Sequence, residues 1–179
     1  MKHTTLFATI IAASFSTMAF AAGSDSSEPP TPTETTSKCP EGFVYVPEDN
    51  VCRKPKETNF TDDQIYNNAR ELAYDGQYET ALELLEMAKN PNDPRILNYK
   101  GFANRKAGNA DVAMSYYQAA LDIDPNYILA RSYMGQGLVA EGRMDEALAQ
   151  LEEIEARGGR DTWAWAALDK AIHGEVTNW

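Results

Sequence analysis

Two cysteines, Cys39 and Cys52, are the side chains of this 179-residue chain best suited to covalent chemistry. A redox pair is usually spaced much more closely, and a metal site would need two further ligands. An even number of cysteines is typical of a structural disulfide in a chain that reaches an oxidising compartment. Closing a ring of this size constrains the unfolded chain by about 3 kcal/mol. We therefore expect a Cys39–Cys52 disulfide.

Residue combinations that support catalysis are scarce. His173 is the only histidine besides His3, and no Ser or Cys nucleophile has a partner nearby in the sequence. Acidic pairs such as Glu152 and Glu153 fall on predicted helices, where exposed carboxylates are usual. No glycine-rich segment leads into Lys-Ser or Lys-Thr, and no His, Cys and Asp cluster has the spacing of a metal site. We expect no enzymatic activity, no cofactor and no metal.

The overall charge narrows the class of partner. The formal net charge is −11, which repels nucleic-acid backbones and anionic membrane surfaces. No cluster of five or more Lys and Arg reverses that charge locally. Nucleic acid is therefore not an expected partner.

The first 22 residues have the pattern of a secretory signal peptide. Lys2 precedes an uncharged run from Leu6 to Phe20, and Ala19-Phe20-Ala21 fits a cleavage site. The run is shorter than the roughly 20 apolar residues of a membrane-spanning helix, and no second such run follows. We expect cleavage near Ala21 or Ala22, a periplasmic or secreted protein, and no membrane span.

Two short segments follow the expected cleavage site. Residues 23–38, GSDSSEPPTPTETTSK, have the composition of a disordered Ser/Thr/Pro-rich linker. Residues 39–58 should form a disulfide-closed β-hairpin and connector, because an apolar run at 43–46 precedes a turn at 47–50. A hairpin of this size is marginal alone, so either the disulfide suffices or the hairpin rests on the following region. A docking face formed by Phe43 and Tyr45 is an alternative role.

From about residue 60 the chain repeats itself. The segments GQYETA (76–81), GNADVA (108–113) and GRMDEA (142–147) align, with alanines at 81, 113 and 147. Another small residue stands twelve positions before each alanine, at Ala69, Gly101 and Gly135. This spacing indicates pairs of antiparallel helices that cross closely at small side chains.

These segments resemble the tetratricopeptide-repeat (TPR) family, most clearly at 115–127 and 130–148. The resemblance covers about residues 60–160 as three repeats, at about 62–93, 94–127 and 128–160. It implies an all-α solenoid of helical hairpins. Lys100 and Asn104 replace large apolar residues of the family pattern, so the first helix of repeat two should pack through Ile96, Leu97 and Ala103.

Residues 161–179 are expected to add a capping helix and a tail. Gly158 and Gly159 can end the preceding helix, and Asp161 or Thr162 can cap a new one. The spacing of Trp165, Leu168 and Ile172 would place them on one face of that helix. Such a helix would cover the end of the stack.

The resemblance implies that the first helix of each repeat lines a concave groove for a protein or peptide ligand. It carries eight residues to that groove: Tyr66, Arg70, Asn98, Phe102, Arg105, Lys106, Ser132 and Gln136. The three cations among them favour an acidic segment or a C-terminal carboxylate. We therefore expect a non-catalytic adaptor in the cell envelope.

Two other functions stay open at this point. The chain could be a structural subunit of an envelope assembly that docks through its convex face or its C-terminal helix. A third reading is self-association through an incompletely capped stack.

Overall fold

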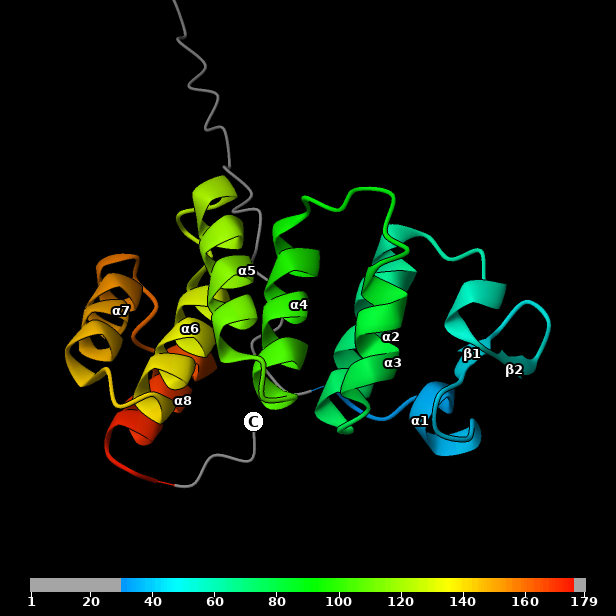
Figure 1. The fold of residues 1–179 in the computed structure, drawn as a ribbon, viewed down its shortest axis with the longest axis horizontal. Coiled ribbons are helices and arrows are strands. Elements are labelled where there is room, and N and C mark those ends of the chain that lie inside the picture. Colours follow the sequence, from blue (N-terminus) through cyan, green and yellow to red (C-terminus); the bar gives the residue numbers. More distant parts are fainter. Residues whose placement is uncertain (1–29, 176–179) are drawn as a thin grey trace, which may run out of the picture.

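The structure, a computed structural model, describes residues 30–175. The expected signal peptide and residues 23–29 of the expected linker lie outside the described residues. The described part begins with a small N-terminal module, which consists of α1, β1, β2 and η1, and continues as paired helices (Figure 1). The elements in order are α1 (Glu34–Lys38), β1 (Val44–Val46), β2 (Val51–Arg53), η1 (Pro55–Glu57), α2 (Asp62–Tyr74), α3 (Tyr78–Leu85), α4 (Pro94–Lys106), α5 (Ala110–Ile123), α6 (Ile128–Ala140), α7 (Met144–Ala156) and α8 (Trp163–Ile172).

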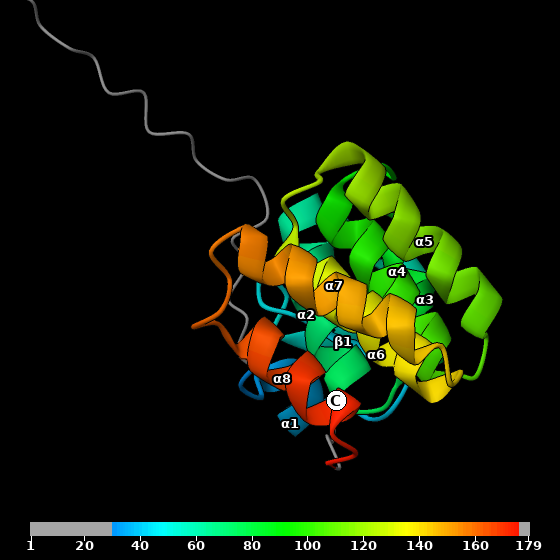
Figure 2. The same cartoon turned by 90° about the vertical axis from the view of Figure 1, so that its left-hand side faces the viewer.

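The helices form three hairpins, α2–α3, α4–α5 and α6–α7, and α8 packs on α6 and α7. Each hairpin turns at a glycine: Gly76, Gly108 and Gly142 have φ angles of 86°, 89° and 76°. Glycine adopts this left-handed conformation without strain and so ends the first helix of each pair. The N-terminal module and α8 lie at opposite ends of the stack, and Figure 2 looks along it from the α7 and α8 end.

The small residues of the repeat lie at close helix contacts. Ala81, Ala113 and Ala147 are fully buried. A Cβ atom on Gly101 would lie 2.6 Å from the Tyr117 ring, and one on Gly135 would lie 2.6 Å from Leu168. The predicted all-α stack of helical hairpins, preceded by a small hairpin, is confirmed.

The first helix of repeat two, α4, packs through the apolar residues expected for it. Ile96, Leu97 and Ala103 are buried in α4. Lys100 is buried along its apolar stem, and its Nζ atom forms an ion pair with Glu86 at 2.8 Å. Asn104 donates its amide to the Lys100 carbonyl oxygen. The polar substitutions are therefore accommodated by local polar contacts.

The linker prediction is wrong for residues 33–38. Thr33 caps α1, and the backbone amides and hydroxyls of Thr33 and Thr36 donate hydrogen bonds to the Glu71 carboxylate of α2. The Thr35 hydroxyl donates to Asn68 of the same helix. Glu71 is only 5% exposed, and a buried carboxylate requires such donors. The segment is held by polar contacts, which a Ser/Thr/Pro-rich composition does not reveal.

The β-hairpin rests on the helices rather than on its disulfide alone. β1 and β2 pair antiparallel with Tyr45 opposite Cys52, and the Cys39–Cys52 disulfide is present as predicted. Val44 and Val46 are buried in the same apolar core as the inner face of α2. The Gly42 amide also donates to the Gln77 side chain at 3.0 Å. The two readings of the hairpin are thereby resolved in favour of docking on the stack.

The last helix closes the other end of the stack. Thr162 accepts a hydrogen bond from the Trp165 amide and caps α8. Ala164, Ala167 and Leu168 form its buried face, so the expected face through Trp165 and Ile172 is shifted by part of a turn. Trp165 instead donates its indole N–H to Glu155 at 2.9 Å. No helix within residues 30–175 combines the length and apolarity that crossing a bilayer would require.

Replacing Gly101 with alanine tests the close helix crossing. Alanine is the better helix former, yet the new methyl group would collide with the fully buried Tyr117 ring. We expect Gly101→Ala to lower the free energy of unfolding by about 1–3 kcal/mol in urea titrations followed by circular dichroism. In the matched variant Gly137→Ala the methyl group meets the flexible side chains of Met114 and Arg105, so stability should hold or rise. Equal stability of the two variants would contradict this packing.

Replacing Glu71 with glutamine tests the anchor of the N-terminal module. The amide nitrogen of glutamine cannot accept hydrogen bonds, so at least one threonine donor loses its partner. We expect Glu71→Gln to cost about 1–3 kcal/mol and to speed proteolysis near residues 30–38. Glu79→Gln, at an exposed position of α3, serves as the control. Unchanged cleavage in Glu71→Gln would show that the module is held by other contacts.

Candidate functional site

Aromatic side chains from the first helix of each of the three hairpins meet on one side of the stack. We call α2, α4, α6 and α8 the inner helices, because each contacts the next along the stack. Phe102 of α4 stacks on Tyr74 of α2 at 5.3 Å and lies 4.8 Å from the Tyr133 ring of α6. Tyr99 of α4 packs edge-on against Tyr133 at 6.2 Å. The four rings, Tyr74, Tyr99, Phe102 and Tyr133, form the aromatic cluster.

The hydroxyl groups of this cluster are hydrogen-bonded. The hydroxyls of Tyr74 and Tyr133 lie 2.6 Å apart, and Arg70 Nε donates to the Tyr99 hydroxyl at 3.1 Å. Burial raises the pKa of each of these tyrosines above its usual value. The phenols of the cluster therefore stay neutral inside the stack.

Two cations lie beside the same ring of the cluster. The Arg105 guanidinium carbon is 5.5 Å from the centre of the Phe102 ring, and Lys106 Nζ is 6.0 Å from it. Arg105 Nε donates to the Tyr117 hydroxyl at 3.4 Å, but its buried Nη2 has no hydrogen-bond partner within residues 30–175. Burial, and then the charge of Arg105, lowers the pKa of Lys106. An anion bound beside both cations would accept a hydrogen bond from Arg105 Nη2 and would raise the pKa of Lys106.

Two buried amides of the inner helices also have an unused acceptor. Asn98 donates to the Tyr127 hydroxyl and Gln136 donates to the Ser132 hydroxyl. Among the described residues, Asn98 Oδ1 and Gln136 Oε1 accept no hydrogen bond although both side chains are buried. Most buried polar atoms in proteins are paired, so these two oxygens are unusual in leaving an acceptor unused.

The eight residues predicted for the groove therefore divide into groups. Phe102, Arg105 and Lys106 lie together, and Arg70 joins them through Tyr99. Tyr66, one turn before Arg70 on α2, packs against the Tyr99 ring at 5.5 Å. The Ser132 hydroxyl is used to hold α8, donating to the Ala164 carbonyl oxygen at 2.6 Å. Five of the eight are buried rather than open to solvent: Tyr66, Asn98, Phe102, Ser132 and Gln136.

The sequence reading missed the tyrosines of the cluster. Tyr99 and Tyr133 each stand two residues before the small residue of their repeat, Gly101 and Gly135. That recurrence was a usable signal, because a ring at a fixed place in two repeats must pack in the same way twice. Tyr74 had no such repeat equivalent.

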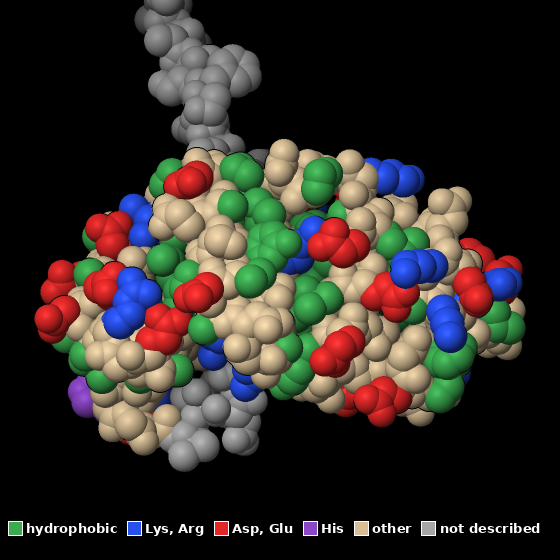
Figure 3. All heavy atoms as spheres, in the orientation of Figure 1, with side chains coloured by type: hydrophobic (Ala, Val, Ile, Leu, Met, Phe, Trp, Pro, Cys, Tyr) green, Lys and Arg blue, Asp and Glu red, His purple; other side chains and the backbone are tan. Residues whose placement is uncertain are grey.

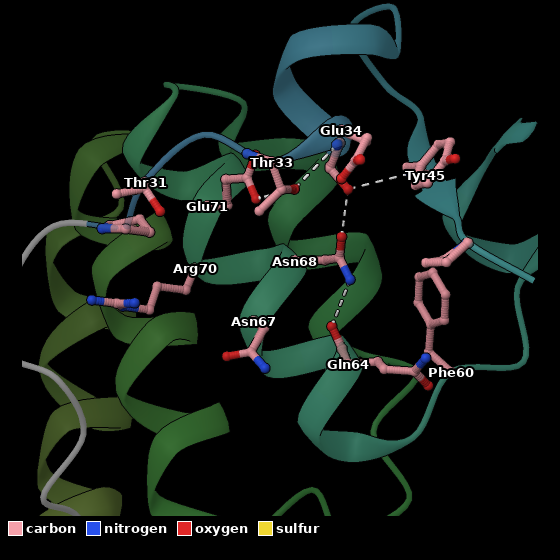
Figure 4. Close-up of a pocket in the computed structure, with 13 residues that line it drawn as sticks. Thr31, Thr33, Glu34, Tyr45, Phe60, Gln64, Asn67, Asn68, Arg70 and Glu71 are labelled. Carbon is pink, nitrogen blue, oxygen red and sulfur yellow. Dashed lines mark hydrogen bonds between the residues drawn. The ribbon is translucent and has the colours of Figure 1, made fainter. Parts of the chain in front are cut away.

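A separate cavity lies where the N-terminal module meets α2; we call it the seam cavity (Figure 4). It measures about 430 Å³. Arg70 and Asn67 project from α2 toward the side where Thr31 lies, whereas Phe60 and Tyr45 lie on the side of the hairpin. Tyr45 therefore faces this cavity, while Phe43 does not line it. The full lining is Pro30, Thr31, Thr33, Glu34, Thr35, Tyr45, Pro47, Phe60, Gln64, Asn67, Asn68, Arg70 and Glu71.

The helices α5 and α7 expose apolar side chains. Hydrophobic side chains gather over α4 and α5 in Figure 3, among scattered acidic and basic ones. Val112 and Ile123 of α5 are 46% and 51% exposed, and Met144 and Leu148 of α7 are also exposed. No group of three or more His, Cys, Asp or Glu in the described part of the chain is placed to hold a metal ion.

Comparison with known proteins bears on the helical region. A family model described as "Tetratricopeptide repeat" matches residues 104–171, from the end of α4 to the end of α8. Photosystem I assembly protein Ycf3 of Acaryochloris marina (strain MBIC 11017) is 27% identical over 124 aligned residues, and the match covers 65% of this chain and 75% of that protein. No solved structure matches this chain. Together with the helical hairpins and their recurring small residues, these findings show a fold of helical repeats of the tetratricopeptide type.

Proposed function

We propose that this protein is a non-catalytic adaptor of the cell envelope whose inner helices bind an extended, acidic segment of another protein. Five buried side-chain atoms within residues 30–175 have no hydrogen-bond partner there, two of them being Asp124 Oδ2 and Arg131 Nε. The observation that carries this proposal is that the other three are Asn98 Oδ1, Arg105 Nη2 and Gln136 Oε1. All three belong to side chains of α4 and α6 that the sequence had predicted for ligand binding.

An unpaired buried polar atom costs about 1–3 kcal/mol, which a bound main chain can recover. The two amide oxygens are acceptors and suit peptide N–H groups. The Arg105 guanidinium is a donor and suits a carbonyl or carboxylate oxygen. An extended peptide offers both kinds of group along one strand, and tetratricopeptide repeats are protein-binding modules in general.

The acidic character of the ligand follows from local charge. Arg105 and Lys106 lie beside one ring in a chain whose net charge is −11, so this region differs in sign from the molecule as a whole. A carboxylate there would accept charge-assisted hydrogen bonds from both cations. A basic ligand would be repelled.

An envelope location is supported by two features of the chain. The Cys39–Cys52 disulfide is typical of oxidising compartments, and the N-terminal residues have the pattern of a signal peptide. The relative named as an assembly protein supports a role in bringing protein partners together.

The alternative, a permanent structural subunit, is favoured by the apolar residues on α5 and α7. Such a subunit would bury Val112, Ile123 and Leu148 in a stable complex. Size-exclusion chromatography with light scattering on native extract distinguishes the two functions. We expect a substantial free pool of the adaptor, whereas a permanent subunit would elute only as a large complex.

The cations of α4 provide the test of the binding proposal. Peptides selected from a random 12-residue library on the full chain serve as the probe, and fluorescence anisotropy gives their affinity. We expect enrichment of Asp and Glu. The double variant Arg105→Gln, Lys106→Gln should bind these peptides about 10–100-fold more weakly, since each charge-assisted hydrogen bond contributes roughly 1.5–3 kcal/mol.

Glutamine is chosen because it keeps an N–H donor for Tyr117 and avoids placing a new charge in a partly buried site. Lys89→Gln, at an exposed position between α3 and α4, removes a cation elsewhere and should leave the affinity unchanged. Equal binding by the double variant and by Lys89→Gln would refute the proposed site.

A further inference from the structure

One position of the repeat differs between repeat one and the other two. The residue two places before the small residue is tyrosine in repeats two and three, at Tyr99 and Tyr133. In repeat one the same position, two places before Ala69, is Asn67. The smaller side chain stands where the stack meets the N-terminal module.

In repeats two and three this tyrosine fills the contact between its own inner helix and the preceding one. We call such a contact a joint. Tyr99 packs back against Tyr66 of α2 at 5.5 Å, and Tyr133 packs back against Phe102 of α4 at 4.8 Å. Both tyrosines are fully buried. The ring at this position is therefore what closes each joint.

In repeat one the corresponding joint is hollow. Asn67 is exposed and lines the seam cavity, which measures about 430 Å³ (Figure 4). That volume falls in the lower part of the usual range for ligand pockets, about 300–1,000 Å³. A second cavity of about 510 Å³ shares Phe60 and Gln64 with the first.

The walls of the seam cavity are held in place independently of any occupant. Glu71 of α2 accepts the hydrogen bonds of Thr33 and Thr36, and Asn68 accepts that of Thr35. The hairpin that carries Tyr45 is closed by the Cys39–Cys52 disulfide. A preformed cavity requires little ordering when a ligand enters, which favours affinity.

The lining suits an aromatic side chain with a polar tip. The rings of Tyr45 and Phe60 and the prolines Pro30 and Pro47 offer apolar surface, and the Asn67 amide and Arg70 guanidinium offer polar contacts. The carboxylates of Glu34 and Glu71 line the same cavity and would repel phosphate or another anion. A phenol side chain matches this combination, as Tyr99 does at the next joint, where its hydroxyl accepts from Arg70.

We propose that the seam cavity binds a tyrosine-type aromatic side chain supplied by the partner segment, which thereby takes the place of the ring that repeat one lacks. The inference rests on the proposed function, because the segment must lie along the inner helices. Arg70 connects the two places, since it lines the seam cavity and donates to Tyr99. A 12-residue peptide can extend about 40 Å and so can reach both.

Filling the cavity from within the chain provides the test. Asn67→Tyr restores the residue of repeats two and three, whereas Asn67→Ala leaves the cavity open at the same position. The peptides selected above from the 12-residue library are the probe. We expect them to carry a Tyr or Phe near their acidic residues. Asn67→Tyr should weaken their binding at least about tenfold, the effect of excluding one buried aromatic side chain, and Asn67→Ala only about two- to threefold.

A peptide in which that aromatic residue is changed to alanine completes the comparison. The alanine peptide should bind the wild-type chain about tenfold more weakly than the parent peptide does. The two peptides should bind Asn67→Tyr with equal affinity, because the cavity of that variant is already filled. Urea unfolding should show that Asn67→Tyr is as stable as the wild type, so that loss of binding is not loss of fold.

The outcomes separate this inference from the proposed function. Peptides that depend on Arg105 and Lys106 but bind Asn67→Tyr as tightly as wild type would overturn the seam assignment alone. Failure to select any peptide that depends on Arg105 and Lys106 would overturn the proposed function and this inference with it.

Discussion

The close approach of neighbouring helices at small side chains is the constraint on which the rest of the structure depends. Gly101 lies directly against the Tyr117 ring and Gly135 directly against Leu168, with no room for a single methyl group. This approach fixes the angle and spacing of the hairpins, because packed cores admit few alternative arrangements. It brings the inner helices near enough for rings on α2, α4 and α6 to touch one another.

The functional surface is a consequence of that arrangement. Rings such as Tyr99 and Tyr133 close the joints between repeats and occupy much of the inner side, leaving cations and amides beside them. Arg105 and Lys106 are held over Phe102, where partial burial strengthens any interaction with an anion. The N-terminal module extends the stack at the joint where Asn67 stands in place of the tyrosine of repeats two and three.

The sequence was informative wherever a feature is local or repeated. The glycine turns, the recurring alanines and the Cys39–Cys52 pairing could be predicted because each depends on short spacing or on a fixed period. The anchoring of Thr33 and Thr36 by Glu71 could not, because it joins residues 38 and 35 positions apart through polar contacts that leave no periodic pattern. The burial of Ser132 was missed for the same reason: it depends on where α8 packs.

The central claim is that the inner helices, and not the outer ones, contact the partner in the cell. Site-specific photo-crosslinking tests it most directly, with the reactive residue placed either at Ala107, exposed beside Lys106 at the end of α4, or at Val112 on the exposed side of α5. We predict a discrete crosslinked product from position 107, mapped by mass spectrometry to an acidic segment of one partner, and none from position 112. A partner attached through position 112 alone would contradict it.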